Sequence, residues 1–277
     1  MKYLPLEGDI IIPIGFGDND ETSSIYSLDL SDFTETNLYI KSVRPDIIIH
    51  LAGNKDVFRC ESDKTFSIKI NYETSKNIVE QCSSKNIRLI YISTDYVFNG
   101  NGVPFHELSH PKPATQYGKD KLATENLIKE ALSDYAVVRS AGIFGLKNDF
   151  VETVLDNVRH KSIFYAYANL KNTPTFIKDF SSMLHKIISK GHIGTFHCAG
   201  SESISRYDFA IKVAENFQLE KDLIVPTTLD SDDVRPADLS MDCLWTYITL
   251  GYYPSNIETI LKTHNNIWQS QSLLTND

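Results

Sequence analysis

A tyrosine and a lysine four positions apart, Tyr117 and Lys121, have the spacing of an acid–base pair. In a helix, residues i and i+4 lie on one face, one turn apart. A lysine ammonium beside the phenol favours phenolate, so we expect Lys121 to lower the pKa of Tyr117 from its usual value of about 10. Such a tyrosine can exchange a proton near neutral pH, as ketone reduction or alcohol oxidation requires. The pattern alone is also typical of an ordinary amphipathic helix with a surface lysine.

The elements around this pair are alternating strands and helices. Residues 46–51, 88–92 and 136–139 are short, continuous apolar runs of the kind found in parallel strands buried on both faces. Residues 63–82 and 117–132 have the composition of helices. Strands separated by helices predict right-handed βαβ units, and therefore an α/β fold with a parallel sheet.

Small and polar residues follow each predicted strand. Residues 51–53, 93–94 and 140–142 fall at the carboxyl ends, where ligands of such sheets bind. Thr94 would end its strand there and supply a hydroxyl that fixes the substrate oxygen. The placement suits an active site.

Several ordered motifs between about residues 44 and 242 resemble one family. They are residues 44–46, 50–53, 93–100, 117–125 and 235–238. With these motifs the sequence resembles the extended short-chain dehydrogenase/reductases. Within them it is most similar to the RmlD-like sugar-nucleotide reductases, the dTDP-4-dehydrorhamnose reductase group.

This resemblance implies the fold and the domain organisation. The expected fold is α/β, with a Rossmann-like, doubly wound parallel sheet and a smaller C-terminal substrate lobe. Residues 1–145 would form the nucleotide-binding domain. Residues 146–277 would form the substrate lobe, interleaved with the last elements of the sheet.

The resemblance also implies a site. Its catalytic residues would be Thr94, Tyr117 and Lys121, and NADPH or NADH would be the cofactor. The further cofactor contacts that it implies are Ala52, Gly53 and Asn71. The substrate contacts that it implies are Asp95, Val97, Phe98 and Arg235. The substrate would be a nucleotide sugar whose C4 keto group is reduced, as in dTDP-rhamnose and polysaccharide biosynthesis.

The N-terminus departs from the family pattern. The family opens with a strand, a glycine-rich turn and a helix that holds the cofactor pyrophosphate. Here no G-x-x-G-x-x-G occurs, and residues 10–17 predict a strand that runs into a reduced turn, with Gly15 and Gly17 as altered cofactor contacts. Residues 18–21 add three carboxylates. We expect about one βα unit to be shortened or missing, followed by a helix that Asp32 begins.

Two interpretations of function follow. The predicted catalytic trio favours a reductase, whereas the lost phosphate turn favours a non-catalytic or regulatory subunit. The methionine adenosyltransferase β subunit shows that this family also supplies such partners. An epimerase or dehydratase of the same fold is a third interpretation. The close dTDP-rhamnose reductases carry a tryptophan where residues 140–144 include a glycine, so the identity of the sugar stays open. Whether the protein forms a homodimer or binds a heteromeric partner also stays open.

Composition excludes several classes of protein. The net charge of −9 disfavours nucleic-acid binding. The four cysteines have no C-x-x-C spacing and the eight histidines form no ligand motif, so we predict no metal. No apolar run is long enough to span a membrane and no signal peptide begins the sequence, so we expect a cytoplasmic protein.

Overall fold

The fold is built around one parallel sheet. The computed structural model describes residues 10–15, 26–101 and 103–269. Its largest sheet has four strands in the order β10-β5-β4-β3, and every neighbouring pair is parallel. These strands are β3 (Ile47–His50), β4 (Arg88–Thr94), β5 (Tyr135–Ser140) and β10 (Gly194–His197). The first three are the strands that the apolar runs predict.

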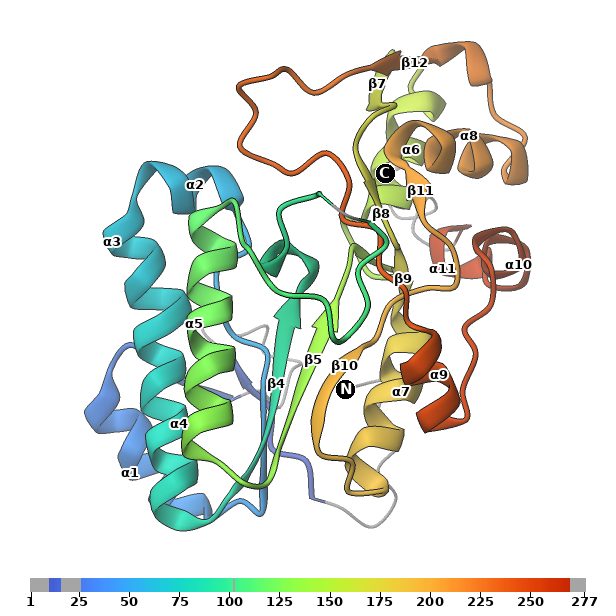
Figure 1. The fold of residues 1–277 in the computed structure, drawn as a ribbon. Coiled ribbons are helices and arrows are strands. Elements are labelled where there is room, and N and C mark those ends of the chain that lie inside the picture. The colour runs from blue at the N-terminus through green and yellow to red at the C-terminus, as the bar shows by residue number, and fades with distance from the viewer. Residues whose placement is uncertain (1–9, 16–25, 102, 270–277) are drawn as a thin grey trace.

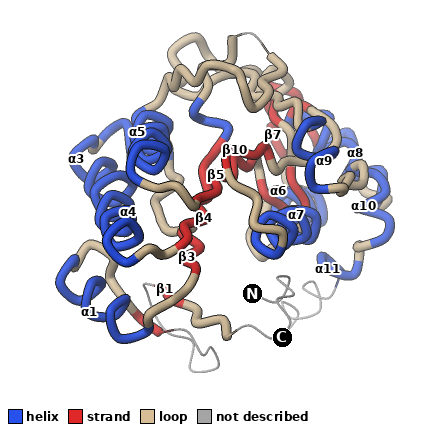
Figure 2. Tube along the Cα trace, turned by 60° about the horizontal axis from the view of Figure 1, so that its bottom comes forward, coloured by secondary structure: helices blue, strands red, loops and turns tan. Residues whose placement is uncertain are grey.

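Helices cover both faces of this sheet (Figures 1 and 2). One face carries α1 (Phe33–Val43), α4 (Thr74–Lys85) and α5 (Gln116–Ala131), and the other carries α7 (Ile177–Ser189) and α9 (Leu244–Leu250). Along β4, Leu89 and Tyr91 pack against the first group, and Ile90 between them packs against the second. This alternation is the two-residue period of a strand. The sheet is therefore doubly wound and of the Rossmann type, as predicted.

The helix predicted over residues 63–82 is one helical run with an irregular centre. Asp63 begins it, because its carboxylate accepts a hydrogen bond from the Phe66 amide at 2.9 Å. The segments are α3 (Lys64–Ser67), a π-helical turn η1 (Ile68–Glu73) and α4, with the short α2 (Val57–Ser62) before them. π-helical turns are frequent at functional sites, and this one contains Asn71.

The N-terminal strands are much reduced. β1 (Ile14–Gly15) pairs in parallel with β2 (Tyr26–Ser27), and among the described residues this two-stranded sheet has no ladder to β3. The expected start of α1 is confirmed, since Asp32 accepts a hydrogen bond from the Glu35 amide at 2.9 Å.

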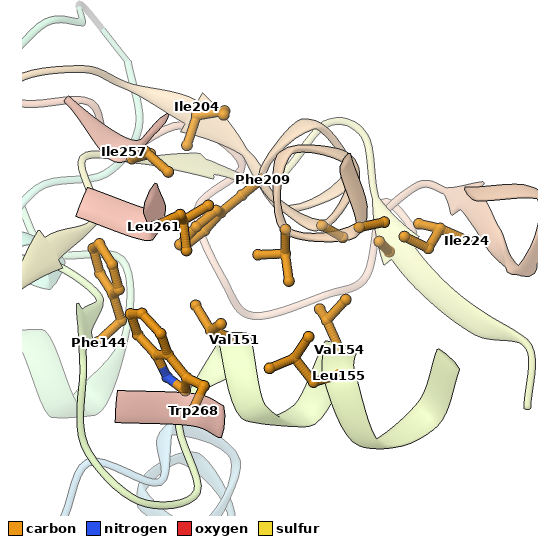
Figure 3. Close-up of a cluster of buried hydrophobic side chains, with 14 of the residues drawn as sticks. Phe144, Val151, Val154, Leu155, Ile204, Phe209, Ile224, Ile257, Leu261 and Trp268 are labelled. Atoms are coloured by element: carbon orange, nitrogen blue, oxygen red, sulfur yellow. The ribbon is translucent and has the colours of Figure 1, made fainter. Parts of the chain in front are cut away.

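The second half of the chain feeds both the sheet and a separate core. Phe144 and Trp268 stack in this core with ring centroids 6.3 Å apart (Figure 3). Trp268 Nε1 donates a hydrogen bond to Asp149 Oδ2 at 3.2 Å. The elements around it are α6 (Phe150–Arg159), β7 (Phe164–Tyr167), α8 (Arg206–Asn216), β12 (Ile224–Thr227), α10 (Ile257–Thr263) and α11 (Asn266–Gln269). The second half of the chain also contributes to the first core, since β10 is a strand of the sheet and α7 and α9 pack on it. A domain boundary near residue 145 stays a proposal.

Short elements connect the sheet to this second core. Two strand pairs run between them, one parallel and one antiparallel. They are β6 (Ile143–Phe144) with β9 (Thr175–Phe176), and β8 (Lys171–Asn172) with β11 (Ile204–Ser205). The remaining turns are the 3-10 helices η2 (Asp95–Val97) and η3 (Lys221–Leu223).

A buried ion pair ties α5 to the middle of the sheet. Arg139 of β5 donates through Nε and Nη2 to the two carboxylate oxygens of Glu125, at 3.0 and 2.7 Å. Ser93 of β4 donates to the same carboxylate at 2.6 Å. Burial alone would raise the pKa of Glu125, but the hydrogen bonds and charge of Arg139 outweigh it and the pKa is lowered. Glu125 is therefore ionised inside the protein.

We predict that Glu125→Gln destabilises the fold by about 3–5 kcal/mol, because it leaves the Arg139 charge buried without its counter-ion. The matched control is Glu80→Gln, which removes an exposed pair with Lys76 at 3.9 Å and should cost less than about 0.5 kcal/mol. Urea unfolding measures both. Equal, small losses in the two variants would contradict a structural role for the buried pair.

Candidate active site

The end of β4 meets the first turn of α5. Thr94 is the last residue of β4, and Tyr117 lies in the first turn of α5, which Thr115 caps by accepting from the Gly118 amide at 3.1 Å. The Thr94 hydroxyl lies close enough to the Tyr117 phenol to lower its pKa. Tyr96 packs edge-on against Tyr117, with ring centroids 5.9 Å apart. Two of the three predicted catalytic residues are therefore in contact.

Gly118 permits this contact. A Cβ at position 118 would lie 2.0 Å from the Tyr96 carbonyl oxygen in η2. No larger residue fits at that distance, so the close approach of α5 to η2 requires glycine. The glycine in the sequence pattern thus positions Tyr117 against Thr94.

Lys121 is placed differently from the prediction. Its Nζ donates to the Ile92 carbonyl at 2.6 Å and lies 4.1 Å from the centre of the Tyr91 ring. Burial lowers the pKa of Lys121 to about 7. The ammonium is therefore bound to the end of β4 and is only partly charged at neutral pH.

The predicted lowering of the Tyr117 pKa is wrong for this structure. Burial raises that pKa above its ordinary value, and the largest opposing effect is the hydrogen bond with Thr94 rather than the charge of Lys121. The reason is desolvation, which disfavours phenolate and ammonium alike when both groups are buried. The phenol consequently keeps its proton at neutral pH.

Asp95 extends the contact between Thr94 and Tyr117. Its carboxyl group is buried, and Thr94 Oγ1 donates to Asp95 Oδ1 at 3.0 Å. Burial raises the pKa of Asp95 to about 7, although the Thr94 hydrogen bond and the charge of Arg206 act against this rise. A carboxyl group whose pKa is raised to about 7 therefore accepts a hydrogen bond from Thr94.

Two guanidinium groups face this end of the sheet. Arg235 pairs with Asp233 through hydrogen bonds of 2.9 and 2.6 Å, and it lies over the rings of Phe58 and Tyr167. Its charge acts on Tyr96, and the substrate contact of Arg235 stays a prediction.

Arg206, the first residue of α8, is a functional candidate that the sequence analysis missed. Its charge acts on Asp95 and Tyr96, and its Cζ lies 4.8 Å from the centre of the Phe150 ring. Basic residues are unfavourable in the first turn of a helix because of the helix dipole. An arginine directly after the capping residue Ser205 was the available signal.

Val97 and Phe98 have a packing role. Both side chains are fully buried, and Phe98 stacks on Phe105 with ring centroids 4.2 Å apart. The Arg139 guanidinium lies 5.2 Å from the Phe98 ring. The substrate contacts predicted for these two residues stay a prediction.

The predicted cofactor residues after β3 form an exposed turn with a buried support. Ala52 and Gly53 are exposed, and a Cβ on Gly53, at φ +157°, would lie 2.8 Å from Asn71 Oδ1. That oxygen accepts from the Asn54 amide at 2.8 Å. Asn71 itself is buried, so it shapes the turn, and the backbone of Ala52 and Gly53 is what a ligand can reach.

The predicted glycine contacts at the N-terminus are only partly described. Gly15 ends β1, and its carbonyl accepts from the Leu28 amide at 2.9 Å. Gly17 and the acidic residues 18–21 lie outside the described residues. A cofactor contact at this turn stays a prediction.

Three further findings concern the described ranges 10–15, 26–101 and 103–269. Within them, no three histidine, cysteine, aspartate or glutamate side chains lie close enough together to hold a metal ion. No helix there combines the length and apolar character needed to cross a membrane. The four cysteines are buried and free.

The fold and the site together define a Rossmann-type protein of the short-chain dehydrogenase/reductase class. Its marks are the doubly wound parallel sheet, the hydroxyl of Thr94 at the end of β4, and the tyrosine and lysine of α5. The chain belongs to the RmlD substrate binding domain family, whose match covers residues 17–263 of 277.

Individual relatives point to two kinds of protein. The chain is 28% identical to the methionine adenosyltransferase 2 subunit beta of Bos taurus, over 83% of the chain and 72% of that protein. It is also 28% identical to the dTDP-4-dehydrorhamnose reductase of Aggregatibacter actinomycetemcomitans, over 86% and 88%. The solved dTDP-4-dehydrorhamnose reductase of Bacillus anthracis in complex with NADP has a TM-score of 0.77 and 27% identity, over 86% and 88% of the two chains.

We predict that Lys121 makes stability pH-dependent around neutrality. Its pKa of about 7 in the folded protein is below that of the unfolded chain, so the unfolded state binds more protons above pH 7 and stability rises with pH. Between pH 6 and 8.5, wild type should therefore gain stability relative to Lys121→Met, by at most about 1.4 kcal/mol per pH unit. Denaturant unfolding measures the gain. Lys119→Met, on the exposed face of the same helix, should show no such difference, and a constant gap for Lys121→Met would contradict the assignment.

Proposed function

We propose that this protein is an NAD(P)H-dependent reductase of the C4 keto group of a nucleotide-linked 4-keto-6-deoxy sugar. The observation that carries the proposal is the pair of Thr94, at the end of β4, and Tyr117, in the first turn of α5 that packs against it at Gly118. The pair lies at the carboxyl end of β4, the edge of an open α/β sheet where ligands bind. Family membership and the two relatives named dTDP-4-dehydrorhamnose reductase support the substrate class.

The residues that follow β3 and those of α5 fit one half of a binding site for a nicotinamide dinucleotide. The exposed backbone of Ala52 and Gly53 follows β3, and the glycine conformation is fixed by Asn71 behind it. Tyr117 and Lys121 would hold the nicotinamide ribose, for which Lys121 must exchange its bond to the Ile92 carbonyl. The B. anthracis relative in complex with NADP favours NADPH over NADH.

Each side chain of this site would have a separate role in carbonyl reduction. A bound nicotinamide dinucleotide would supply hydride to the carbonyl carbon. Thr94 would donate a hydrogen bond to the carbonyl oxygen, and Tyr117 would give its proton to the same oxygen. Because burial raises the pKa of Tyr117, the phenol starts each cycle protonated, as an acid in reduction must be. Arg235 would contact the anionic part of the nucleotide sugar.

The setting of this activity follows from its substrate. We infer that a reductase of nucleotide sugars would act in the cytoplasm, as a homodimer or with a protein partner. The net charge of −9 disfavours nucleic acid as that partner.

A regulatory subunit without turnover is the second candidate. One observation favours it: the chain is 28% identical to methionine adenosyltransferase 2 subunit beta over 83% of its length. Such a subunit would use the same end of the sheet to bind a nucleotide or a partner segment. It would form a stable heteromeric complex on pull-down and reduce no sugar nucleotide.

We predict that Tyr117→Phe lowers kcat by about 10²–10⁴-fold, the range expected when a positioned general acid is removed. Oxidation of NADPH in the presence of a dTDP-linked 4-keto-6-deoxy sugar measures kcat. Tyr165→Phe is the control, because Tyr165 is an exposed tyrosine of β7, and it should leave kcat unchanged. A Tyr117→Phe enzyme with wild-type kcat would remove Tyr117 from the mechanism.

We also predict that NADPH stabilises the protein. A cofactor at 100 times its Kd adds about 2.7 kcal/mol, which should raise Tm by roughly 5–10 °C for a chain of this size. Thermal unfolding with NADPH, with NADH and with ADP-ribose as the control measures the shift and ranks the two cofactors. If neither cofactor shifts Tm, the reductase proposal fails and the regulatory subunit becomes the better account.

A further inference from the structure

Two side chains that carry N–H donors meet beside the end of β5. A Cβ at Gly142 would lie 2.6 Å from Asn172 Nδ2 and 3.6 Å from Arg206 Nη2, so both nitrogens lie close to one point beside the Gly142 backbone. Gly142 comes two residues after Ser140, which ends β5 and pairs with Thr94 of β4. Two residues of chain span at most about 7 Å. Both nitrogens therefore lie at the same edge of the sheet as Thr94.

Backbone pairing brings the two side chains to this point. Asn172 of β8 pairs with Ile204 of β11. The amide of Arg206, directly after β11, donates to the carbonyl of Leu170, directly before β8, at 3.0 Å. The main chain of this strand pair therefore holds the asparagine and the arginine close together.

The donors of these two side chains are unused within the part of the chain that the structure describes. No described residue accepts a hydrogen bond from the Arg206 guanidinium or the Asn172 carboxamide, and no described carboxylate forms an ion pair with that guanidinium. Both residues are partly buried. Arg206 Cζ lies 4.8 Å from the centre of the Phe150 ring, which offers no acceptor oxygen. A partly buried guanidinium without an anionic partner is costly, and an anionic ligand would supply that partner.

The charges around Arg206 favour the same kind of ligand. The charge of Arg235 acts on Arg206 and lowers its pKa, as does burial. Asp233 is already paired with Arg235, at 2.9 and 2.6 Å. Asp95 also acts on Arg206, but burial raises the pKa of this carboxyl to about 7, so it is only partly charged at neutral pH. Much of the positive charge of Arg206 is therefore left for a ligand.

We propose that Arg206 and Asn172 bind one oxyanion group, a phosphate or a carboxylate, of the nucleotide sugar, an inference that rests on the proposed function for the class of ligand. Either group accepts charge-assisted hydrogen bonds from a guanidinium and has a further oxygen for the carboxamide. Gly142 keeps the point between the two donors open, because a Cβ there would lie 2.6 Å from Asn172 Nδ2. A phosphate would belong to the nucleotide, whereas a carboxylate would belong to the sugar and make it a sugar acid.

Equilibrium binding of three probes tests this inference without turnover. The probes are dTDP, dTDP-glucose and dTDP-glucuronate, titrated by calorimetry into wild type and Arg206→Gln. Removing a charge-assisted hydrogen bond should raise the Kd by about 10–100-fold. If the oxyanion is a phosphate, Arg206→Gln should weaken all three probes alike. If it is the carboxylate, the variant should weaken dTDP-glucuronate alone.

Arg44→Gln is the matched control. Arg44 is an exposed arginine at the end of α1, which directly precedes β3 and so lies at the opposite edge of the sheet. It removes the same charge and should leave every Kd unchanged. A loss of binding as large as that of Arg206→Gln would show an effect of net charge and overturn the inference.

Asn172→Asp tests the same site with the arginine in place. The new carboxylate would pair with Arg206 and repel an oxyanion, so the Kd should rise at least as much as in Arg206→Gln, whereas the Tm of the free protein should not fall. A purely structural role would lower Tm instead. The inference is overturned if this variant binds every probe with the wild-type Kd, or if wild type binds none of them. If the variants behave as expected but wild type reduces no 4-keto nucleotide sugar, the reductase function fails and the oxyanion site stands.

Discussion

The separation between helix α5 and the end of β4 governs the geometry of the site. Two features set it: Gly118, which allows the helix to touch the Tyr96 carbonyl, and Glu125, which binds Arg139 and Ser93 in the sheet. Tyr117 and Lys121 lie beside these two points. A helix held at both places cannot rotate or slide without losing a buried ion pair or a close backbone contact. The contact between Tyr117 and Thr94 is therefore a consequence of how α5 packs.

Desolvation then decides the charges within that geometry. It lowers the pKa of Lys121 and raises that of Asp95, each to about 7, so the amine and the carboxyl group are both partly neutral near pH 7. It also raises the pKa of Tyr117, so the phenol stays protonated there. Arg206 and Arg235, from the second half of the chain, stay positively charged at neutral pH and face this site. This division suits a substrate that is neutral at its reacting carbonyl and anionic at its nucleotide end.

The sequence predicts the sheet more completely than it predicts the site. Apolar runs and the alternation of elements locate β3, β4 and β5 to within a few residues, because backbone periodicity is a local property. The group that the Lys121 ammonium binds depends on how distant elements bury it. The i+4 spacing therefore predicts the position of Lys121 on the helix, but not that its ammonium binds the Ile92 carbonyl. Arg206 reaches Asp95 only through the folded chain. Val97 and Phe98 were assigned from a motif, which does not report that their side chains pack inward.

The candidate residues for proton transfer and the family's cofactor turn belong to different parts of this fold. Thr94 and Tyr117 depend on β4 and α5, whose packing rests on the series β10-β5-β4-β3. The family's pyrophosphate turn follows the first strand of the fold. In the described residues this N-terminal part of the fold consists of the short strands β1 and β2. No described ladder joins that part to β3, so changes there need not disturb Thr94, Tyr117 or Asp95. A reductase and a regulatory subunit can therefore share the same catalytic half, and the strength of cofactor binding is the property that separates them.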